Sequence, residues 1–87
     1  MNDDSLFEFP SDFPIKAMGR DTPHFKQLVI DLVAVHATFD AEADVKVQSS
    51  SNGTFLSVTV TFEARNREQL DNIYQSLHDH NDILMTF

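Results

Sequence analysis

Four histidines are the side chains best suited to acid–base or metal chemistry in this sequence, and two of them lie close together. His78 and His80 flank Asp79 near the end of a predicted helix. Residues two apart on a helix do not face each other, and the chain has no cysteine to supply a thiolate ligand. Histidines near a helix C-terminus are instead stabilised by the helix dipole. We therefore expect no metal site, and we expect the isolated His24 and His36 to be surface or helix-end groups.

Carboxylates and serines are the next candidates for chemistry. Asp40, Glu42 and Asp44 alternate, but the segment lacks the central glycine and the terminal glutamate of an EF-hand calcium loop. A solvated loop explains this spacing better. The serines at positions 11, 49–51 and 57 show no arrangement with histidine and aspartate that would activate a nucleophile. The sequence predicts no catalytic residues, no cofactor and no enzymatic activity.

The segment Gly19-Arg20-Asp21-Thr22 is the best candidate for binding a small molecule. It precedes a predicted helix whose free N–H groups attract a carboxylate, and Gly19 allows close approach of the backbone. The alternative is an ordinary capped turn in which glycine is needed at position 19 only for its backbone angles. We favour this alternative but keep Gly19, Arg20, Asp21 and Thr22 as possible ligand-binding residues.

The elements that position these residues follow from the spacing of apolar side chains and from helix caps. Thr22 is a good N-cap and Pro23 suits the first helical position, while Asn66 and Gln69 resemble a capping box. Period-two alternation marks the strands. The predicted elements are a strand over 13–18 that begins next to Pro14 and ends at Gly19, a helix from 23 to 37–39, strands over 44–50 and 56–63, a helix from 67 to 78–81, and a strand over 82–87.

The segment Asn52-Gly53 is typical of a two-residue type I′ hairpin turn, in which both residues have positive φ. With this turn, Val47 lies opposite Val58, and Lys46 lies opposite Thr59. A slip of one residue would move every valine to the other face of the sheet, so the alternation determines the pairing register.

The element order β-α-β-β-α-β predicts an α+β fold, a ferredoxin-like two-layer sandwich. Right-handed crossovers place the first and third strands in the centre of a four-stranded antiparallel sheet, with both helices on one face. A chain of 87 residues has room for one domain. We assign residues 13–87 to it and residues 1–12 to an extended N-terminal arm.

The charge of the chain excludes several classes of partner. Fourteen acidic and six basic residues give a formal net charge of −8, which disfavours nucleic acid and anionic membranes. The outward positions of the third strand, Ser57, Thr59 and Thr61, also lack the aromatic side chains on which RNA-recognition motifs stack bases. The acidic N-terminus and the absence of a long apolar run predict a cytoplasmic protein without a signal peptide or membrane span.

Three groups of residues resemble the YbeD-like family of small bacterial proteins of unknown function. They are Phe9-Pro10-x-x-Phe13-x-Ile15-Lys16-Ala17-Met18-Gly19, then Ser49-Ser50-Ser51-x-Gly53-x-Phe55-x-Ser57-Val58-Thr59-Val60, and Gln69-x-x-x-Ile73-Tyr74-x-x-Leu77. The resemblance runs from Leu6 to near the end of the chain. It implies a bacterial cytosolic protein with a ferredoxin-like fold, similar to regulatory domains that bind amino acids, and it implies no catalytic residues.

We expect this protein to act through contacts with other proteins. The main hypothesis is a non-enzymatic regulatory or adaptor protein, a monomer or weak homodimer. The alternatives are a sensor of an amino acid or related metabolite and an accessory subunit of a metabolic enzyme. The uncovered sheet face is the suggested binding surface, because its lysines lie beside hydroxyl side chains. We expect the apolar N-terminal arm to pack at the border of this surface, next to Met18, Phe55 or Leu84. The possible partner-binding residues are Leu6, Phe7, Phe9, Lys16, Lys46, Ser57 and Thr59.

Overall fold

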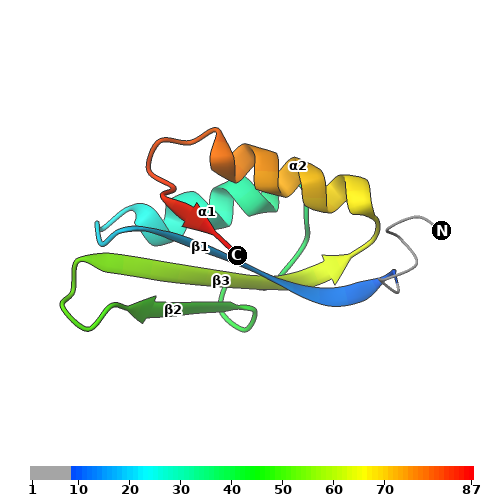
Figure 1. The fold of residues 1–87 in the computed structure, drawn as a ribbon. Helices are drawn as coiled ribbons and strands as arrows, with labels where there is room; N and C mark the ends of the chain where they lie inside the picture. The colour runs from blue at the N-terminus through cyan, green and yellow to red at the C-terminus, as the bar shows by residue number, and fades with distance from the viewer. Residues whose placement is uncertain (1–8) are drawn as a thin grey trace.

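Six elements follow one another along residues 9–87, the part of the chain that the computed structural model describes. They are β1 (Ser11–Arg20), α1 (Phe25–Ala34), β2 (Val45–Ser49), β3 (Phe55–Ala64), α2 (Arg67–His78) and β4 (Met85–Thr86). The strands form one antiparallel sheet in the order β2-β3-β1-β4, and both helices lie on the same side of it (Figure 1). The predicted ferredoxin-like arrangement is confirmed.

The core lies between one face of the two central strands and one stripe of each helix. Alternate residues of β1 and β3 point toward the helices because side chains of a strand alternate between faces. Each large aliphatic side chain buried there contributes roughly 1.5–3 kcal/mol. The fully buried residues are Ile15, Ala17, Val29, Val33, Val58, Val60, Ala64, Ile73 and Leu77.

The hairpin register follows the sequence prediction, but the turn does not. Val47 pairs with Val58 and Lys46 with Thr59, as expected. Among residues 9–87, however, only Gly53 has a positive φ, of 73°, so a type I′ turn centred on Asn52 and Gly53 is wrong.

The observed loop spans residues 51–54 and is built around a single tight turn. The Gly53 N–H donates to the oxygen of Ser50 at 3.0 Å, and the Asn52 side-chain oxygen accepts from the Thr54 N–H at 3.1 Å. These bonds satisfy the polar groups of the loop, and Asn52 keeps a negative φ. The register is nevertheless the predicted one, because Ser50 lies opposite Phe55 and its N–H donates to the Phe55 oxygen at 2.9 Å.

Helix α1 is shorter than the sequence predicts at both ends. It begins at Phe25 with His24 as N-cap, and no side chain caps it. Thr22 contributes its backbone oxygen instead, which accepts from the Phe25 N–H at 3.2 Å. The helix ends at Ala34, and beyond it the His36 N–H donates to the oxygen of Val33, three residues back, at 3.0 Å.

Helix α2 begins as predicted. The Gln69 N–H donates to the Asn66 side-chain oxygen at 2.8 Å. The reciprocal bond differs from a standard capping box, because the Gln69 side-chain oxygen accepts from the N–H of Arg65. The Gln69 amide also donates to the oxygen of His36 at 2.8 Å, which ties the start of α2 to the segment after α1.

Strand lengths also differ from the sequence prediction. Strand β1 extends from Ser11 to Arg20, so Pro14 lies inside it and Gly19 does not end it. Pro14 is tolerated because β4 pairs only with Ala17 and Met18, which leaves the side of β1 that Pro14 faces without a neighbouring strand. Strand β4 covers two residues rather than the whole predicted segment.

Candidate functional site

The uncovered face of the sheet carries four of the seven residues that the sequence suggested for partner binding, namely Lys16, Lys46, Ser57 and Thr59. Thr59 on β3 lies between Lys16 of β1 and Lys46 of β2, each its direct cross-strand partner. Phe87 follows on the other side of Lys16, since the Phe87 N–H donates to the Lys16 oxygen at 2.8 Å. One row of four residues therefore crosses the whole sheet. The predicted juxtaposition of the two lysines with Thr59 is confirmed.

The Lys16 side chain contacts the aromatic ring at the end of this row. Its Nζ lies 5.5 Å from the centroid of the Phe87 ring, a cation–π geometry. The next row contains Ser57, which pairs with Met18 and with Gln48, while Met85 pairs with Met18. The open face thus combines cations, hydroxyls and apolar side chains.

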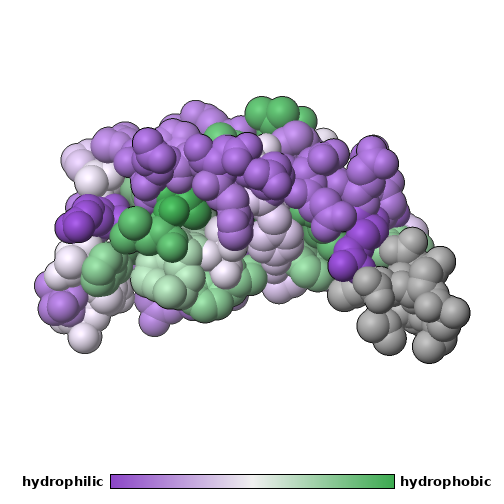
Figure 2. Space-filling model, turned by 45° about the horizontal axis from the view of Figure 1, so that its top comes forward, coloured by the Kyte–Doolittle hydropathy of each residue, from purple (hydrophilic) through white to green (hydrophobic). Residues whose placement is uncertain are grey.

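The last four residues form the main exposed apolar surface of the described chain. Leu84, Met85 and Phe87 are 53%, 49% and 57% exposed. Figure 2 shows hydrophobic surface gathered over β4, below the hydrophilic surface of the helical layer. Ile83 and Thr86 are turned the other way, toward the helices, so a patch of apolar side chains remains outside the core.

The predicted N-terminal arm is only partly described. Leu6 and Phe7 lie outside the described residues. Phe9 is half-buried and packs against the core. It precedes the Ser11 end of β1, whereas Met18 lies near the opposite end of that strand. The expectation that Phe9 borders Met18, Phe55 or Leu84 is wrong, because its side chain points into the helix-covered layer.

The predicted ligand-binding segment is divided between a strand and a turn. Gly19 and Arg20 end β1, while Asp21 donates its N–H to the oxygen of Thr54 at 3.0 Å. Gly19 is buried and its φ is not positive. A Cβ there would overlap the Phe25 ring and the backbone oxygen of Asp82. Gly19 is thus required for close packing and not for its backbone angles.

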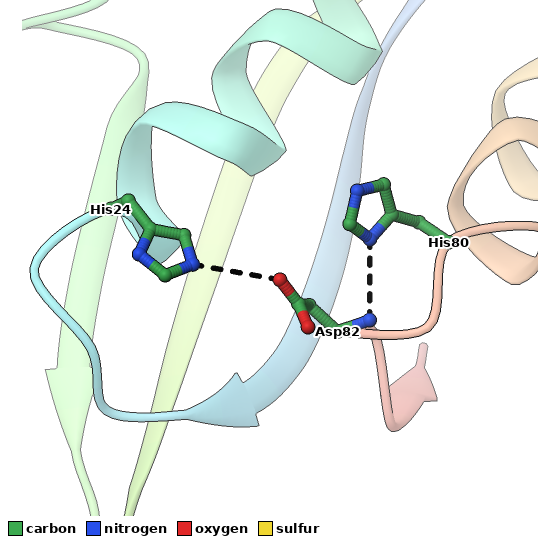
Figure 3. Close-up of polar contacts among 3 residues, drawn as sticks. All are labelled: His24, His80 and Asp82. Atoms are coloured by element: carbon green, nitrogen blue, oxygen red, sulfur yellow. Dashed lines mark hydrogen bonds and ion pairs between the residues drawn. The ribbon is translucent and has the colours of Figure 1, made fainter.

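A small hollow of about 140 Å³ opens beside this segment. Its lining residues are Arg20, Thr22, His24, Phe25, Asn81, Asp82 and Leu84. His24 and Asp82 form one wall, with His24 Nε2 3.5 Å from a carboxylate oxygen of Asp82, while the Asp82 N–H donates to His80 Nδ1 at 3.2 Å (Figure 3). The side chains of His24 and Asp82 are both mostly exposed, so this ion pair contributes under about 1 kcal/mol.

The other histidines have structural contacts. His36 Nε2 lies 2.9 Å from the Ser76 hydroxyl, which joins the segment after α1 to α2. His78 Nε2 lies 3.0 Å from the Thr86 hydroxyl, which joins α2 to β4. Within residues 9–87, no group of three or more histidine, aspartate or glutamate side chains is arranged to hold a metal ion.

The acidic loop before β2 is organised by its own hydrogen bonds. One carboxylate oxygen of Asp40 accepts from the N–H groups of Ala43 at 2.9 Å and Glu42 at 2.8 Å, and these bonds hold the pKa of Asp40 below its ordinary value. The Asp40 N–H in turn donates to Asp44 at 2.8 Å. The carboxylates of Asp40 and Asp44 therefore stabilise a turn.

A second, wider surface hollow lies away from both candidate surfaces. It measures about 430 Å³ between the end of α1 and the start of α2, and it includes His36, Arg65 and Gln69. The polar groups of the Gln69 side chain are already used, as described above, to join the two helices. This hollow is an open polar indentation of the surface, and Gln69 has a structural role in it.

Sequence reasoning missed Met85 and Phe87 as surface residues. Their alternation with Thr86 indicated a strand but not which face would be covered. Their exposure follows from pairing with the outward Met18 and Lys16, and the sequence did not specify this register for the last strand. No helix in the described part of the chain is long and apolar enough to cross a membrane.

The fold and this open face define a small α+β sandwich protein of the ferredoxin-like class. The sequence matches the family described as protein of unknown function (DUF493) over residues 4–87, and the chain belongs to this family, as the YbeD-like resemblance predicted. It is 45% identical over 85 residues to the UPF0250 protein NE1487 of Nitrosomonas europaea, covering 98% of both chains. A UPF0250 protein of Janthinobacterium is 48% identical over 77 residues, covering 88% of this chain and 85% of that one.

The fold is shared with a solved structure of low sequence identity. The solution structure of protein HP0495 from H. pylori superposes with a TM-score of 0.72 at 17% identity, covering 100% of this chain and 94% of that chain. Because the identity is low, the match concerns the fold alone.

Proposed function

We propose that this protein is a small non-enzymatic regulatory or adaptor protein of the bacterial cytoplasm that acts through protein–protein contacts on its open sheet face. The observation that carries the proposal is the composition of this face. Met85 and Phe87 expose apolar surface next to Lys16, while the opposite face of the sheet is covered by two helices. An exposed apolar patch bordered by polar side chains is typical of an interaction surface.

The test compares capture of partners by matched charge variants. A Lys16→Glu, Lys46→Glu double variant changes the open face, and a Lys26→Glu, Arg65→Glu double variant makes the same change in net charge at exposed sites elsewhere. We expect a protein captured from the native cytosol by the wild type to be retained by the second variant and lost by the first. Equal capture by both variants, with folding intact, would overturn the proposal.

A photoreactive residue at Ser57 gives a second and independent readout. Because Ser57 lies on the open face, it is expected to crosslink to the captured protein, whereas the same residue at the exposed Asn72 of α2 is not. Crosslinks from Asn72 alone would assign the contact to the helical face. An accessory subunit of a metabolic enzyme would behave in the same way, and the identity of the captured protein distinguishes it from a regulator.

A sensor of an amino acid or related metabolite is the second candidate. The hollow beside Arg20 supports it, because Arg20 and Asp82 line it together with the apolar Phe25 and Leu84. Thermal-shift measurements with a panel of amino acids test it. A ligand at about 100 times its Kd should stabilise the wild type by about 2.7 kcal/mol, and Arg20→Ala should remove the shift. No shift with any amino acid would exclude this candidate.

A further inference from the structure

The middle of the open sheet face is basic, although the whole chain is acidic. The three basic residues of this face, Lys16, Arg20 and Lys46, are half of the six that the chain contains, although the net charge is −8. Two acidic residues of the same face, Asp12 and Glu63, are cross-strand partners near the Ser11 end of β1. Asp44 lies just before β2, where its oxygen accepts from the N–H of Thr61. The two lysines therefore share the central row of the face, and the Asp12–Glu63 pair makes the Ser11 end of β1 acidic.

The two lysines of the central row lack an anionic partner within residues 9–87. Apart from the contact of Lys16 with Phe87, no ion pair or side-chain hydrogen bond of the described chain involves Lys16 or Lys46. Each lies next to Thr59 on adjacent strands, so their Cα atoms are roughly 10 Å apart. A carboxylate placed above Thr59 can accept from both ammonium groups and from the Thr59 hydroxyl, and it would relieve the repulsion between the two cations.

Apolar side chains lie immediately beside this cationic site. Phe87 extends the same row, and Met18 and Met85 occupy the neighbouring row as a cross-strand pair. Thioether side chains adapt their shape to an apolar partner, and an aromatic ring adds area at low entropic cost. A ligand with a carboxylate and an apolar group on the same short segment would contact both parts.

We propose that the open face binds an acidic segment of a partner protein. Its carboxylates lie over Lys16, Thr59 and Lys46, and an aromatic or aliphatic side chain of the segment packs on Met18, Met85 and Phe87. This inference rests on the proposed function and specifies the chemistry of its partner. The apolar contact supplies most of the affinity, because exposed charge pairs contribute little, and the lysines supply the selectivity for acidic sequence. A polyanion such as RNA would instead be repelled by the acidic end of the face and by the net charge.

Selection from a library of random peptides displayed on phage tests this chemistry while the partner itself is still unidentified. Peptides selected on the wild type are expected to be enriched in aspartate and glutamate within a few residues of an aromatic or aliphatic side chain. Selection on a Lys16→Gln, Lys46→Gln variant should lose the acidic enrichment. Selection on a Lys26→Gln, Arg65→Gln variant, which changes net charge equally, should keep it.

The best selected peptide then gives a quantitative readout. Its Kd should rise about fivefold to tenfold in the Lys16→Gln, Lys46→Gln variant, as expected for two exposed charge pairs, and should return toward the wild-type value in a Lys16→Arg, Lys46→Arg variant. Phe87→Ala should weaken binding at low and high salt alike, whereas the lysine contribution should vanish at high salt. The thermal midpoint of each variant verifies that it is folded.

Three results of the peptide selection would overturn the inference. They are selected peptides without an acidic excess, an equal acidic excess on the Lys16→Gln, Lys46→Gln variant, and no enrichment of any peptide. A pool of random single-stranded RNA retained by the wild type but not by this variant would also overturn it in favour of nucleic acid. The proposed function is tested independently of these results, because crosslinking from Ser57 detects a protein partner whatever the chemistry of that partner.

Discussion

The hydroxyl of Tyr74 donates a hydrogen bond to the backbone oxygen of Phe87, 3.2 Å away. The same oxygen accepts from the Lys16 N–H at 3.2 Å. One atom at the end of the last strand thus connects the helical layer with the sheet. Since β4 has only two residues, contacts of this kind determine whether the apolar patch of Met85 and Phe87 keeps its place.

Tyr74→Phe is expected to destabilise the protein slightly and to alter its response to alkaline pH. Partial burial raises the pKa of the Tyr74 phenol above its ordinary value of 10.0. The unfolded chain therefore ionises first, and the contribution of Tyr74 to stability is complete below pH 10.0 and lost as the pH rises through the raised pKa. The lost hydrogen bond should cost on the order of 1 kcal/mol or less in a partly exposed position.

The measurement uses the fact that Tyr74 is the single tyrosine of the chain, which also lacks tryptophan. Phenolate absorbance of the folded protein reports its ionisation directly, and urea unfolding at neutral and alkaline pH reports the stability. A phenol that titrates in the folded protein as it does in the urea-unfolded chain would contradict this prediction.

Gly19→Ala is expected to be strongly destabilising. The added methyl group would overlap the ring of Phe25 and the backbone oxygen of Asp82, so the start of α1 or the loop before β4 must move. Overpacking of this kind costs about 1–3 kcal/mol, which lowers the Tm of a domain of this size by about 4–8 °C for each kcal/mol.

A double-mutant cycle identifies the cause of this loss. If contact with the ring is responsible, the cost of Gly19→Ala should shrink in a Phe25→Leu background, which keeps an apolar side chain but removes the ring. An unchanged cost would assign the loss to the contact with Asp82. A fully stable Gly19→Ala single variant would refute the packing explanation.

Gly53→Val is expected to destabilise the hairpin by about 1–2 kcal/mol, because a β-branched residue at a φ of 73° is strained. No atom lies within 4 Å of the position a Cβ would take, so crowding does not contribute. Gly53→Asn is the control, since asparagine tolerates positive φ, and it should lose much less. Equal unfolding midpoints for wild type, Val and Asn proteins would show that Gly53 adopts another conformation in solution.

Asn66→Ala should destabilise the start of α2 by about 1 kcal/mol, because it removes the acceptor for the Gln69 N–H. Asn66→Asp retains an acceptor oxygen and places a negative charge at the helix N-terminus, so it should match the wild type. Chemical denaturation of the three proteins measures the difference. A loss of stability with Asp as large as with Ala would argue that the amide group, rather than the oxygen, is needed.

The sequence alone determined the element order, the hairpin register and the cap of α2. These features depend on local periodicity and on side chains within three positions of each other. Val47 and Val58 must share a face whatever surrounds them, and Asn66 can reach the N–H of Gln69 without any other element. For the same reason, the placement of Lys46 beside Thr59 could be predicted from the alternation.

Only the tertiary structure decided what the remaining residues do. Gly19 is needed because Phe25 and Asp82, distant in sequence, pack against it. α1 starts at Phe25 rather than at the proline because the Thr22 backbone, not its side chain, satisfies the first N–H group. Whether Met85 is buried depends on which face of the sheet the two helices cover, which is a property of the packed layers. Alternation assigns side chains to two faces, but only packing determines which face meets water.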